Sequence, residues 1–292
     1  MKTIVLFFIE FLFIFSELNA QKTKQEIGLA VYNIGFGGAV SGIGSVINKK
    51  PEETVGKAFL RGFKWGCVGG SFTYLGKKFS SLINSQKQIL YAWPSKLVHD
   101  FGTSIIVNSA KNTGVFDSYR TQIGFVRFDI SIKGHIKVKP RVMPFALGSF
   151  IYGSFTGKLD FNKTVLIGTP TFIGDTSFFR SGFLGAAGLN AIYMLDTSRF
   201  YLYHMLAHEH IHVLQESQYF SLAVWLTPSD KKFKKESNLT LYGRVSKYIY
   251  LDIPFQRIPR IFMNYPLRCY YRNYLELEAE HFATNSFIRK CY

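Results

Sequence analysis

Acidic residues are scarce in this sequence. Its 292 residues include 19 Asp and Glu against 35 Lys and Arg, which leaves a net charge of +16. The basic residues are scattered, with one cluster at Lys231 to Lys235, and no nucleic-acid recognition motif accompanies them. A basic exported protein is expected to meet anionic lipid, acidic polysaccharide or acidic protein. We therefore predict no nucleic-acid partner and, as one partner, an anionic membrane surface.

Cysteine is also rare. An odd count of three, at Cys67, Cys269 and Cys291, excludes complete pairing within one chain, and no pair has C-x-x-C spacing. Cys269 and Cys291 bracket the C-terminal segment and could form one bridge in an oxidising compartment. Cys67 lies in a glycine-rich apolar region and is expected to be a small buried residue.

Apolar residues, by contrast, are abundant. Hydrophobic residues make up 47% of the chain and aromatic residues 17%, which is too apolar for a disordered coil. The length is sufficient for a large core and allows one or two domains.

The N-terminus has the pattern of a secretory signal. Lys2 precedes a short apolar run broken only by Glu10, and a cleavage site is expected after Ala20. Cleavage would remove one basic and two acidic residues, so the net charge would become +17. An uncleaved membrane anchor is the alternative. Either reading predicts an extracytoplasmic protein, whether periplasmic, secreted or associated with an outer membrane.

Glycine marks the next two segments. Residues 27–47 carry no charge and are long enough to span a bilayer, although six glycines dilute their hydrophobicity. In residues 55–78, Gly62, Gly66 and Gly70 recur every four residues, which on a helix makes a groove for another backbone. The two segments could form a helical hairpin in or on a membrane, with its basic residues facing lipid phosphates. The alternatives are a close-packed helical hairpin in a soluble domain, or glycine-rich loops.

The remaining patterns predict an α+β fold. Trp93-Pro94-Ser95 begins a helix, and the period-two alternation from 121 to 138 predicts strands. Further short strands are expected at four segments: 145–152, 157–161, 164–167 and 189–195. The expected organisation is a signal peptide at 1–20, a glycine-rich helical and possibly membrane-associated region at 21–119, and a domain at 120–292. That domain combines a mainly antiparallel, short-stranded sheet with C-terminal helices.

The motif that indicates chemistry is His208-Glu209-His210-Ile211-His212. On a helix from about 199 to 220, capped by Thr197 or Ser198, His208 and His212 lie about 40° apart, so both imidazoles can reach one Zn²⁺. Glu209 leaves the helix beside that metal, where a carboxylate can take a proton from water. A histidine-rich helix without metal is the alternative.

A catalytic zinc needs a third protein ligand. A helix expected at 271–290 offers four candidates: Glu276, Glu278, Glu280 and His281. Periodicity alone does not choose among them, and the acidic run could also be a solvated face that pairs with nearby basic residues.

The two motifs together resemble a known group. His208-Glu209-x-x-His212-Val213-Leu214-Gln215 followed by Glu278-Ala279-x-x-Phe282-Ala283 is similar to the gluzincin group of zincin metallopeptidases, some of which have a ligand helix that reads E-A-x-x-F-A. The resemblance implies Glu278 as third ligand, Glu209 as general base and Zn²⁺ as cofactor. It covers about two short helices, and the first 190 residues resemble no family of known activity. Gln215 and Gln218 argue against the metzincin pattern.

Two functions follow as hypotheses. The first is an exported zinc-dependent peptidase that hydrolyses a peptide or protein substrate. The alternative is a membrane-associated structural or binding protein whose zincin-like site does not hydrolyse anything. The sequence does not specify an oligomeric state.

Overall fold

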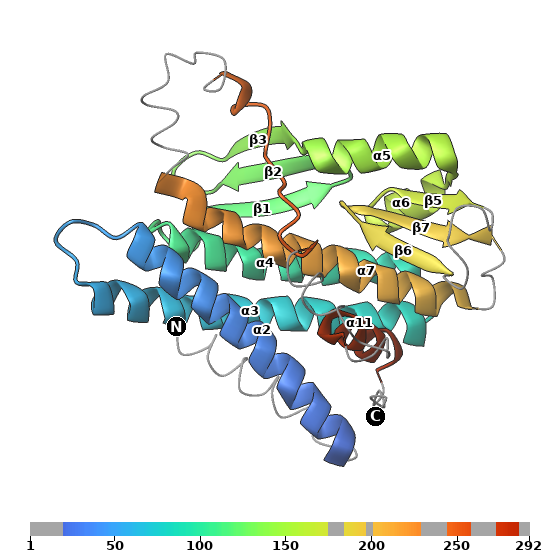
Figure 1. Ribbon diagram of the computed structural model, residues 1–292, viewed down its shortest axis with the longest axis horizontal. Coiled ribbons are helices and arrows are strands. Elements are labelled where there is room, and N and C mark those ends of the chain that lie inside the picture. The colour runs from blue at the N-terminus through green and yellow to red at the C-terminus, as the bar shows by residue number, and fades with distance from the viewer. Residues whose placement is uncertain (1–19, 175–183, 197–200, 229–243, 258–272, 286–292) are drawn as a thin grey trace.

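The computed structural model describes residues 20–174, 184–196, 201–228, 244–257 and 273–285, which form an α+β fold (Figure 1). Outside these residues lie 1–19 of the signal peptide expected at 1–20, the cap candidates Thr197 and Ser198, the basic cluster at 231–235, Cys269 and Cys291. Helices α2 (Ala20–Ile47), α3 (Val55–Ser85) and α4 (Ala92–Ala110) form the layer on which the rest is built.

Helices α2 and α3 form the predicted hairpin, and glycine is the reason that they pack so closely. A Cβ atom added at Gly66 would collide with the carbonyl of Gly37, and one at Gly70 would lie 2.5 Å from the carbonyl of Asn33. Gly62 meets the backbone and side chains of α2 in the same way. The four-residue glycine spacing therefore serves helix–helix packing.

Among the described residues, one stretch is long and apolar enough to cross a membrane: Thr23–Ile47, within α2. In the most apolar window of this stretch, 44% is buried inside the structure. By length and composition it fits a signal sequence, a membrane anchor or a core helix. Cys67 in α3 is a free thiol and is half-buried rather than fully buried as expected.

A three-stranded antiparallel sheet follows α4. Strands β1 (Ser118–Ile123), β2 (Val126–Ser131) and β3 (Lys137–Val142) pair in chain order, which confirms the strands predicted between 121 and 138. Gly124 and Gly134 adopt positive φ at the two turns. The β1–β2 face packs against α4, as Figure 1 shows.

Two predicted strands are helices instead. Segment 145–152 belongs to α5 (Pro144–Thr156) and segment 164–167 belongs to α6 (Phe161–Ile167). The buried positions of α5, Ala146, Ser149 and Gly153, recur every three or four residues, a helical period hidden by aromatic residues that favour strands. Asp160 caps α6 at the Lys163 amide, and Gly168 ends that helix with φ +72.

The second sheet has the order β4-β5-β7-β6. Its strands are β4 (Lys158–Leu159), β5 (Thr171–Gly174), β6 (Gly185–Gly188) and β7 (Ala191–Leu195). Strands β4 and β7 lie within predicted segments, whereas β5 and β6 were not predicted. β5 and β7 are parallel and the other pairs are antiparallel. Among the described strands β6 lies at one edge.

Helix α7 (Leu202–Tyr219) continues into the 3₁₀ segment η4 (Phe220–Leu226), and α11 (Tyr274–Thr284) crosses it (Figure 1). Leu206, Ile211 and Leu214 of α7 are completely buried among residues of α2, α6, β7 and α11. Asn273 caps α11 at the Leu275 amide. Since α3 packs against both α7 and α11, the N-terminal helices support α7, which carries the HExxH motif, and α11.

Candidate metal centre

The two motif histidines converge as their spacing predicts. His208 and His212 lie on the same face of α7, both buried, and their Nε2 atoms are 3.2 Å apart. Helical i, i+4 spacing alone accounts for this approach. Because both rings are buried, the residues packed around them fix their orientation.

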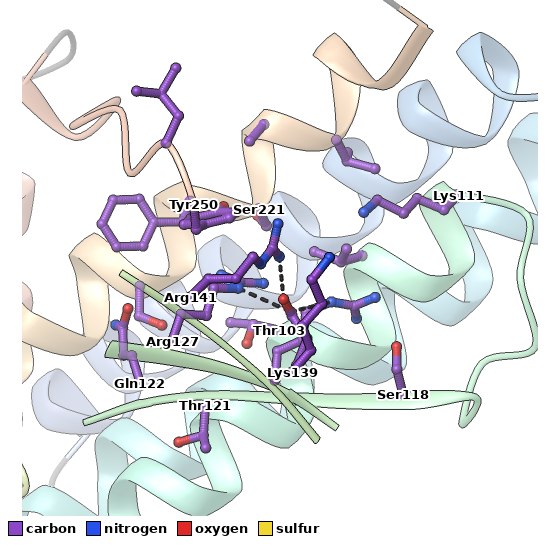
Figure 2. A pocket seen from close by; sticks show the side chains of 18 of the residues that line it. Thr103, Lys111, Ser118, Thr121, Gln122, Arg127, Lys139, Arg141, Ser221 and Tyr250 are labelled. Carbon is purple, nitrogen blue, oxygen red and sulfur yellow. Dashed lines mark hydrogen bonds and ion pairs between the residues drawn. The ribbon is translucent and has the colours of Figure 1, made fainter. Parts of the chain in front are cut away.

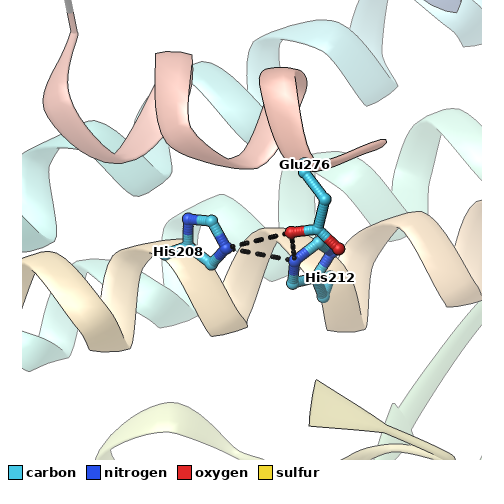
Figure 3. A group of neighbouring side chains, drawn as sticks. All are labelled: His208, His212 and Glu276. Atoms are coloured by element: carbon cyan, nitrogen blue, oxygen red, sulfur yellow. Dashed lines mark hydrogen bonds and ion pairs between the residues drawn. The ribbon is translucent and has the colours of Figure 1, made fainter. Parts of the chain in front are cut away.

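Glu276 of α11 completes a compact group with these histidines (Figure 3). Its Oε2 lies 3.0 Å from Nε2 of His212 and 3.4 Å from Nε2 of His208. Ligand atoms that surround a zinc ion tetrahedrally at about 2.0–2.1 Å lie about 3.3 to 3.4 Å from one another. The three atoms thus form a triangle of the size that a metal ion requires.

Each histidine is held through its other nitrogen. Nδ1 of His212 donates a hydrogen bond to Oε1 of Gln215 at 2.8 Å, and Nδ1 of His208 donates to Oε2 of Glu280 at 3.1 Å. These partners accept from Nδ1, so each Nε2 points into the group and can bind either a proton or a metal ion. The two Nε2 atoms, 3.2 Å apart, would repel unless one of these cations lay between them. The donor set therefore suits a bound metal ion.

The electrostatics of the group also favour a cation. Burial opposes protonation of His208, but hydrogen bonds to Glu276 and Glu280 outweigh it and raise the pKa of His208 to about 10. Burial alone would raise the pKa of Glu280, yet its hydrogen bonds to His204 and His208 lower that pKa to about 2. The carboxylates thus stabilise positive charge on His208, and the histidines stabilise negative charge on Glu280.

Glu278 does not join the histidines, contrary to the third ligand that the resemblance implied. Its carboxylate is completely buried and accepts hydrogen bonds from Lys77 at 2.8 Å, Asn33 at 2.6 Å and Gln215 at 2.8 Å. Lys77 is also completely buried, and its ammonium group donates to Gln218 as well. Glu278 is thereby committed to an ion pair between α11 and α3.

Helical geometry separates the three acidic residues. Glu276 and Glu280 are four residues apart and share one face of α11, whereas Glu278 lies about 160° from Glu276, on the other side. One face meets the histidines of α7 and the other meets α3 and α2. Glu276 and Glu278 are buried and Glu280 is half-buried, so the acidic run is not the solvated face that was the alternative.

Glu209, the general base that the resemblance implied, lies beside edge strand β6. It is buried, and a Cβ atom added at Gly185 would come within 2.9 Å of its Oε1. Its charge also contributes to the raised pKa of His208, which places the carboxylate near the metal ligands. The absence of a side chain at Gly185 on edge strand β6 makes room for Glu209.

The two remaining histidines of the motif region have other roles. His204 binds Oε1 of Glu280 at 2.9 Å and so shares the carboxylate that holds His208. His210 points away, into the core against α4, where Ser95 lies 3.2 Å from its Nε2. Burial, followed by the charges of Lys96 and His99, lowers the pKa of His210 to about 3, so it is neutral.

The comparisons with known proteins supply no relative. No family model, no curated protein and no solved structure matches this chain. The geometry of the site therefore carries the functional argument.

Sequence reasoning missed the buried polar residues that support the site: Asn33, Lys77, Gln215 and Gln218. The signal for Glu276 was available, because only Glu276 and Glu280 stand four residues apart and can both face a second helix. Nothing in the sequence pairs Lys77 with Glu278, which are 201 residues apart.

Proposed function

We propose that this protein is an exported zinc-dependent peptidase, with His208, His212 and Glu276 as metal ligands. The observation that carries the proposal is the triangle of two Nε2 atoms and one Oε2 atom, with both histidines fixed through Nδ1. Two histidines and one carboxylate with an open position are the ligands of a hydrolytic zinc site, although Fe²⁺ also uses such a set. Metal analysis distinguishes the two ions.

When bound, the metal ion supplies a polarised water and a positive charge that stabilises negative charge on a carbonyl oxygen. Glu209 would accept a proton from the attacking water and return it to the leaving amine. Gln215 and Glu280 keep the two imidazoles in the tautomer and orientation that face the metal. The burial of this group excludes bulk water and strengthens each electrostatic interaction.

The substrate is proposed to be an extended peptide that pairs with β6. This strand lies at an edge of its sheet among the described residues, next to Glu209, and all four of its residues are Gly or Ala. Small side chains permit close approach of another backbone, and an edge strand offers unpaired amide and carbonyl groups. The proximity of Gly185 on β6 to Glu209 supports this mode of binding.

The test combines metal content with activity. We expect about one zinc per chain in the wild type and hydrolysis of members of a broad peptide library. Glu209→Gln should keep its zinc and lose activity by about 100-fold or more, because general-base catalysis contributes that much. His212→Ala should lose both.

A matched control is His210→Asn, which changes a histidine of the same helix that faces the core. It should keep its zinc if it folds, which circular dichroism establishes. Equal zinc content in the wild type, Glu209→Gln and His212→Ala would contradict the metal site. Zinc-loaded wild type without any peptidase activity would contradict the enzyme alone.

A second candidate is favoured by the outer face of α3, which we define by the exposed residues Lys57, Leu60, Lys64, Trp65 and Val68. Apolar and basic side chains alternate there, as on surfaces that bind anionic lipid. The protein would then be a membrane-associated binding or structural protein with a zincin-like site that is not catalytic. Loss of this face, but not Glu209→Gln, would then change the phenotype.

Membrane attachment is tested by washing isolated membranes. Release by high salt indicates surface attachment, whereas resistance to salt and carbonate indicates insertion. Replacing Leu60, Trp65 and Val68 with Ser should release a surface-attached protein. Phe155→Ser on α5, whose side chain is 87% exposed, is the control and should have no effect. Recovery of the wild type only in the soluble fraction would contradict membrane attachment.

A further inference from the structure

A second concentration of charge lies away from the metal centre, in a cavity of about 720 Å³. Its floor is the sheet β1–β3, and its walls are α4, η4 and the segment 245–253 (Figure 2). A cavity of this size suits a small molecule. The metal ligands and Glu209 are not among its lining residues.

The charged residues that line it are mostly basic. The lining contains six cationic and two acidic side chains: Lys111, Arg120, Arg127, Lys137, Lys139, Arg141, Asp100 and Asp129. Asp129 faces three guanidinium groups at once: Nε of Arg127 lies 3.1 Å and Nε of Arg120 3.6 Å from its Oδ1, and Arg141 pairs with Oδ2. One carboxylate cannot neutralise three guanidinium groups.

The other acidic residue does not correct the imbalance. Asp100 accepts a hydrogen bond from Thr121 at 2.7 Å, and it is paired electrostatically with the buried Lys96, which does not line the cavity. Neither Lys111 nor Lys139 forms an ion pair with any described residue, although Figure 2 shows both beside the arginine group. The excess positive charge is thus left for a ligand.

The arginines are fixed in position. Tyr250 lies against both Arg127 and Arg141, with its ring centroid 4.0 Å from the first guanidinium carbon and 5.0 Å from the second. Tyr250 itself is held to β3 through hydrogen bonds between its segment and Val142. Nε of Arg141 is buried without a hydrogen-bond partner among the described residues. A rigid donor group with an unused donor is typical of an anion site.

The opposite wall is apolar. Phe220 and Val224 of η4 are buried, and Leu226, Ile249 and Leu251 are exposed along the cavity. Exposed apolar residues beside a cationic floor fit a ligand that is itself amphiphilic. A phosphate group matches an excess of several charges better than a carboxylate, since it carries nearly two negative charges and three acceptor oxygens.

We propose that this cavity binds an organic phosphate with an apolar group. The phosphate lies between Lys111, Lys139 and the arginines, and the apolar group lies against η4 and the 245–253 segment. The ligand is either the headgroup of a membrane lipid or a soluble phosphorylated compound, and both offer the same chemistry.

The state of Lys111 agrees with this assignment. Burial, followed by the charges of Arg120 and Arg127, lowers the pKa of Lys111 to about 7. The charges of Asp129, which raises this pKa, and of Arg141, which lowers it, also act on Lys111. A phosphate beside this ammonium group would raise its pKa again, so ligand binding near pH 7 should take up protons.

Calorimetric titration of the full chain with dihexanoyl phosphatidic acid and with inorganic phosphate tests the proposal. The amphiphile should bind more tightly than inorganic phosphate. The double variant Lys111→Gln, Lys139→Gln should weaken both by about tenfold or more, because it removes charge-assisted hydrogen bonds. These lysines form no ion pair in the described structure, so the arginine group remains intact.

The matched control is Lys133→Gln, Lys158→Gln, which removes the same charge from exposed positions that do not line the cavity. This control variant should bind both ligands with the affinity of the wild type. If phosphate instead bound at the metal centre, neither double variant would change its affinity. Leu226→Ser should weaken binding of the amphiphile alone. Equal binding by both double variants would overturn the site, and equal affinity for inorganic phosphate and the amphiphile would overturn its apolar half.

Vesicles of phosphatidylcholine with and without phosphatidic acid identify the source. A lipid headgroup is indicated if the wild type and the control variant Lys133→Gln, Lys158→Gln sediment with the vesicles that contain phosphatidic acid. The variant Lys111→Gln, Lys139→Gln should then fail to sediment with them. Binding of the monomeric amphiphile without vesicle binding indicates a soluble ligand. Absence of any binding to either amphiphile preparation or inorganic phosphate would contradict the proposal as a whole.

Discussion

The two faces of α11 carry carboxylates of the same type, two residues apart, in different circumstances. On one face, the histidine face, Glu276 and Glu280 meet His204, His208 and His212 of α7 at 2.9 to 3.4 Å. On the other face Glu278 meets Lys77 one to one, and both are completely buried. A buried charge must be compensated. The lysine face, where Lys77 compensates Glu278, needs only the fold, whereas the histidine face offers a group that could hold a metal ion.

The largest expected effect is a difference in zinc content between variants of the two faces. Glu276→Gln should abolish stoichiometric zinc, because it removes the charge and one of three ligands. Glu278→Gln should keep its zinc, since that side chain reaches His212 only through Gln215. Zinc analysis of both folded variants measures the difference. Zinc lost from Glu278→Gln and retained by Glu276→Gln would reverse the assignment.

On the lysine face, a substitution in the Lys77–Glu278 pair should lower the free energy of unfolding. Lys77→Met leaves Glu278 buried without its cation, and such a change costs about 3–5 kcal/mol of unfolding free energy. Burial lowers the pKa of Lys77 although Glu278 opposes that shift, so the pair is held under strong desolvation. Urea unfolding of zinc-loaded protein measures the loss.

The control for that measurement is the double variant Lys77→Met, Glu278→Leu, which removes both charges. It should recover much of the lost stability, because apolar replacements of a buried pair are often neutral. A single variant that loses less than about 1 kcal/mol would show that the pair is not desolvated as the structure indicates.

A smaller effect is expected from the partner of His208. Glu280→Gln should weaken zinc affinity by about 10–100-fold, since outer partners of metal-bound histidines contribute that much. His204→Gln removes the other partner of Glu280 and leaves the bond to His208, so it should weaken zinc binding less. Competition with a chelator measures both. Equal zinc affinities for Glu280→Gln and the wild type would show that Glu280 does not support His208 as a metal ligand.

Local patterns predicted the parts of the fold that depend on near neighbours. The four-residue glycine spacing predicted the α2–α3 hairpin, alternation predicted β1 to β3, and the HExxH spacing predicted that His208 and His212 would meet. Segments 145–152 and 164–167 were predicted wrongly, because aromatic and β-branched residues concealed a helical burial period and a cap at Asp160.

The residues that sequence reasoning assigned differently depend on distant contacts. Whether Glu276 or Glu278 faces α7 is set by which side of α11 meets α3, and that depends on Lys77 and Asn33 more than 200 residues earlier. The cationic cavity likewise joins three strands, α4 and residues near Tyr250. Scattered basic residues in the sequence do not reveal such convergence.

When no metal is bound, His208 on the histidine face of α11 can hold a proton instead. His208 has a pKa of about 10 in the folded protein, against about 6.5 for a free histidine. A raised folded pKa contributes stability that is complete below about pH 6.5 and is lost as the pH rises through about 10. Metal-free protein should therefore lose stability across this window.

We expect the loss to be at least about 1 kcal/mol, because one pKa unit corresponds to about 1.4 kcal/mol. Urea unfolding of metal-free protein from pH 6.5 to 10 measures it, and His208→Gln provides the baseline for all other titrating groups. Zinc should flatten the dependence, since the metal takes the place of the proton between His208 and Glu276. Parallel pH profiles for the metal-free wild type and His208→Gln would show that the carboxylates of α11 do not hold a cation there.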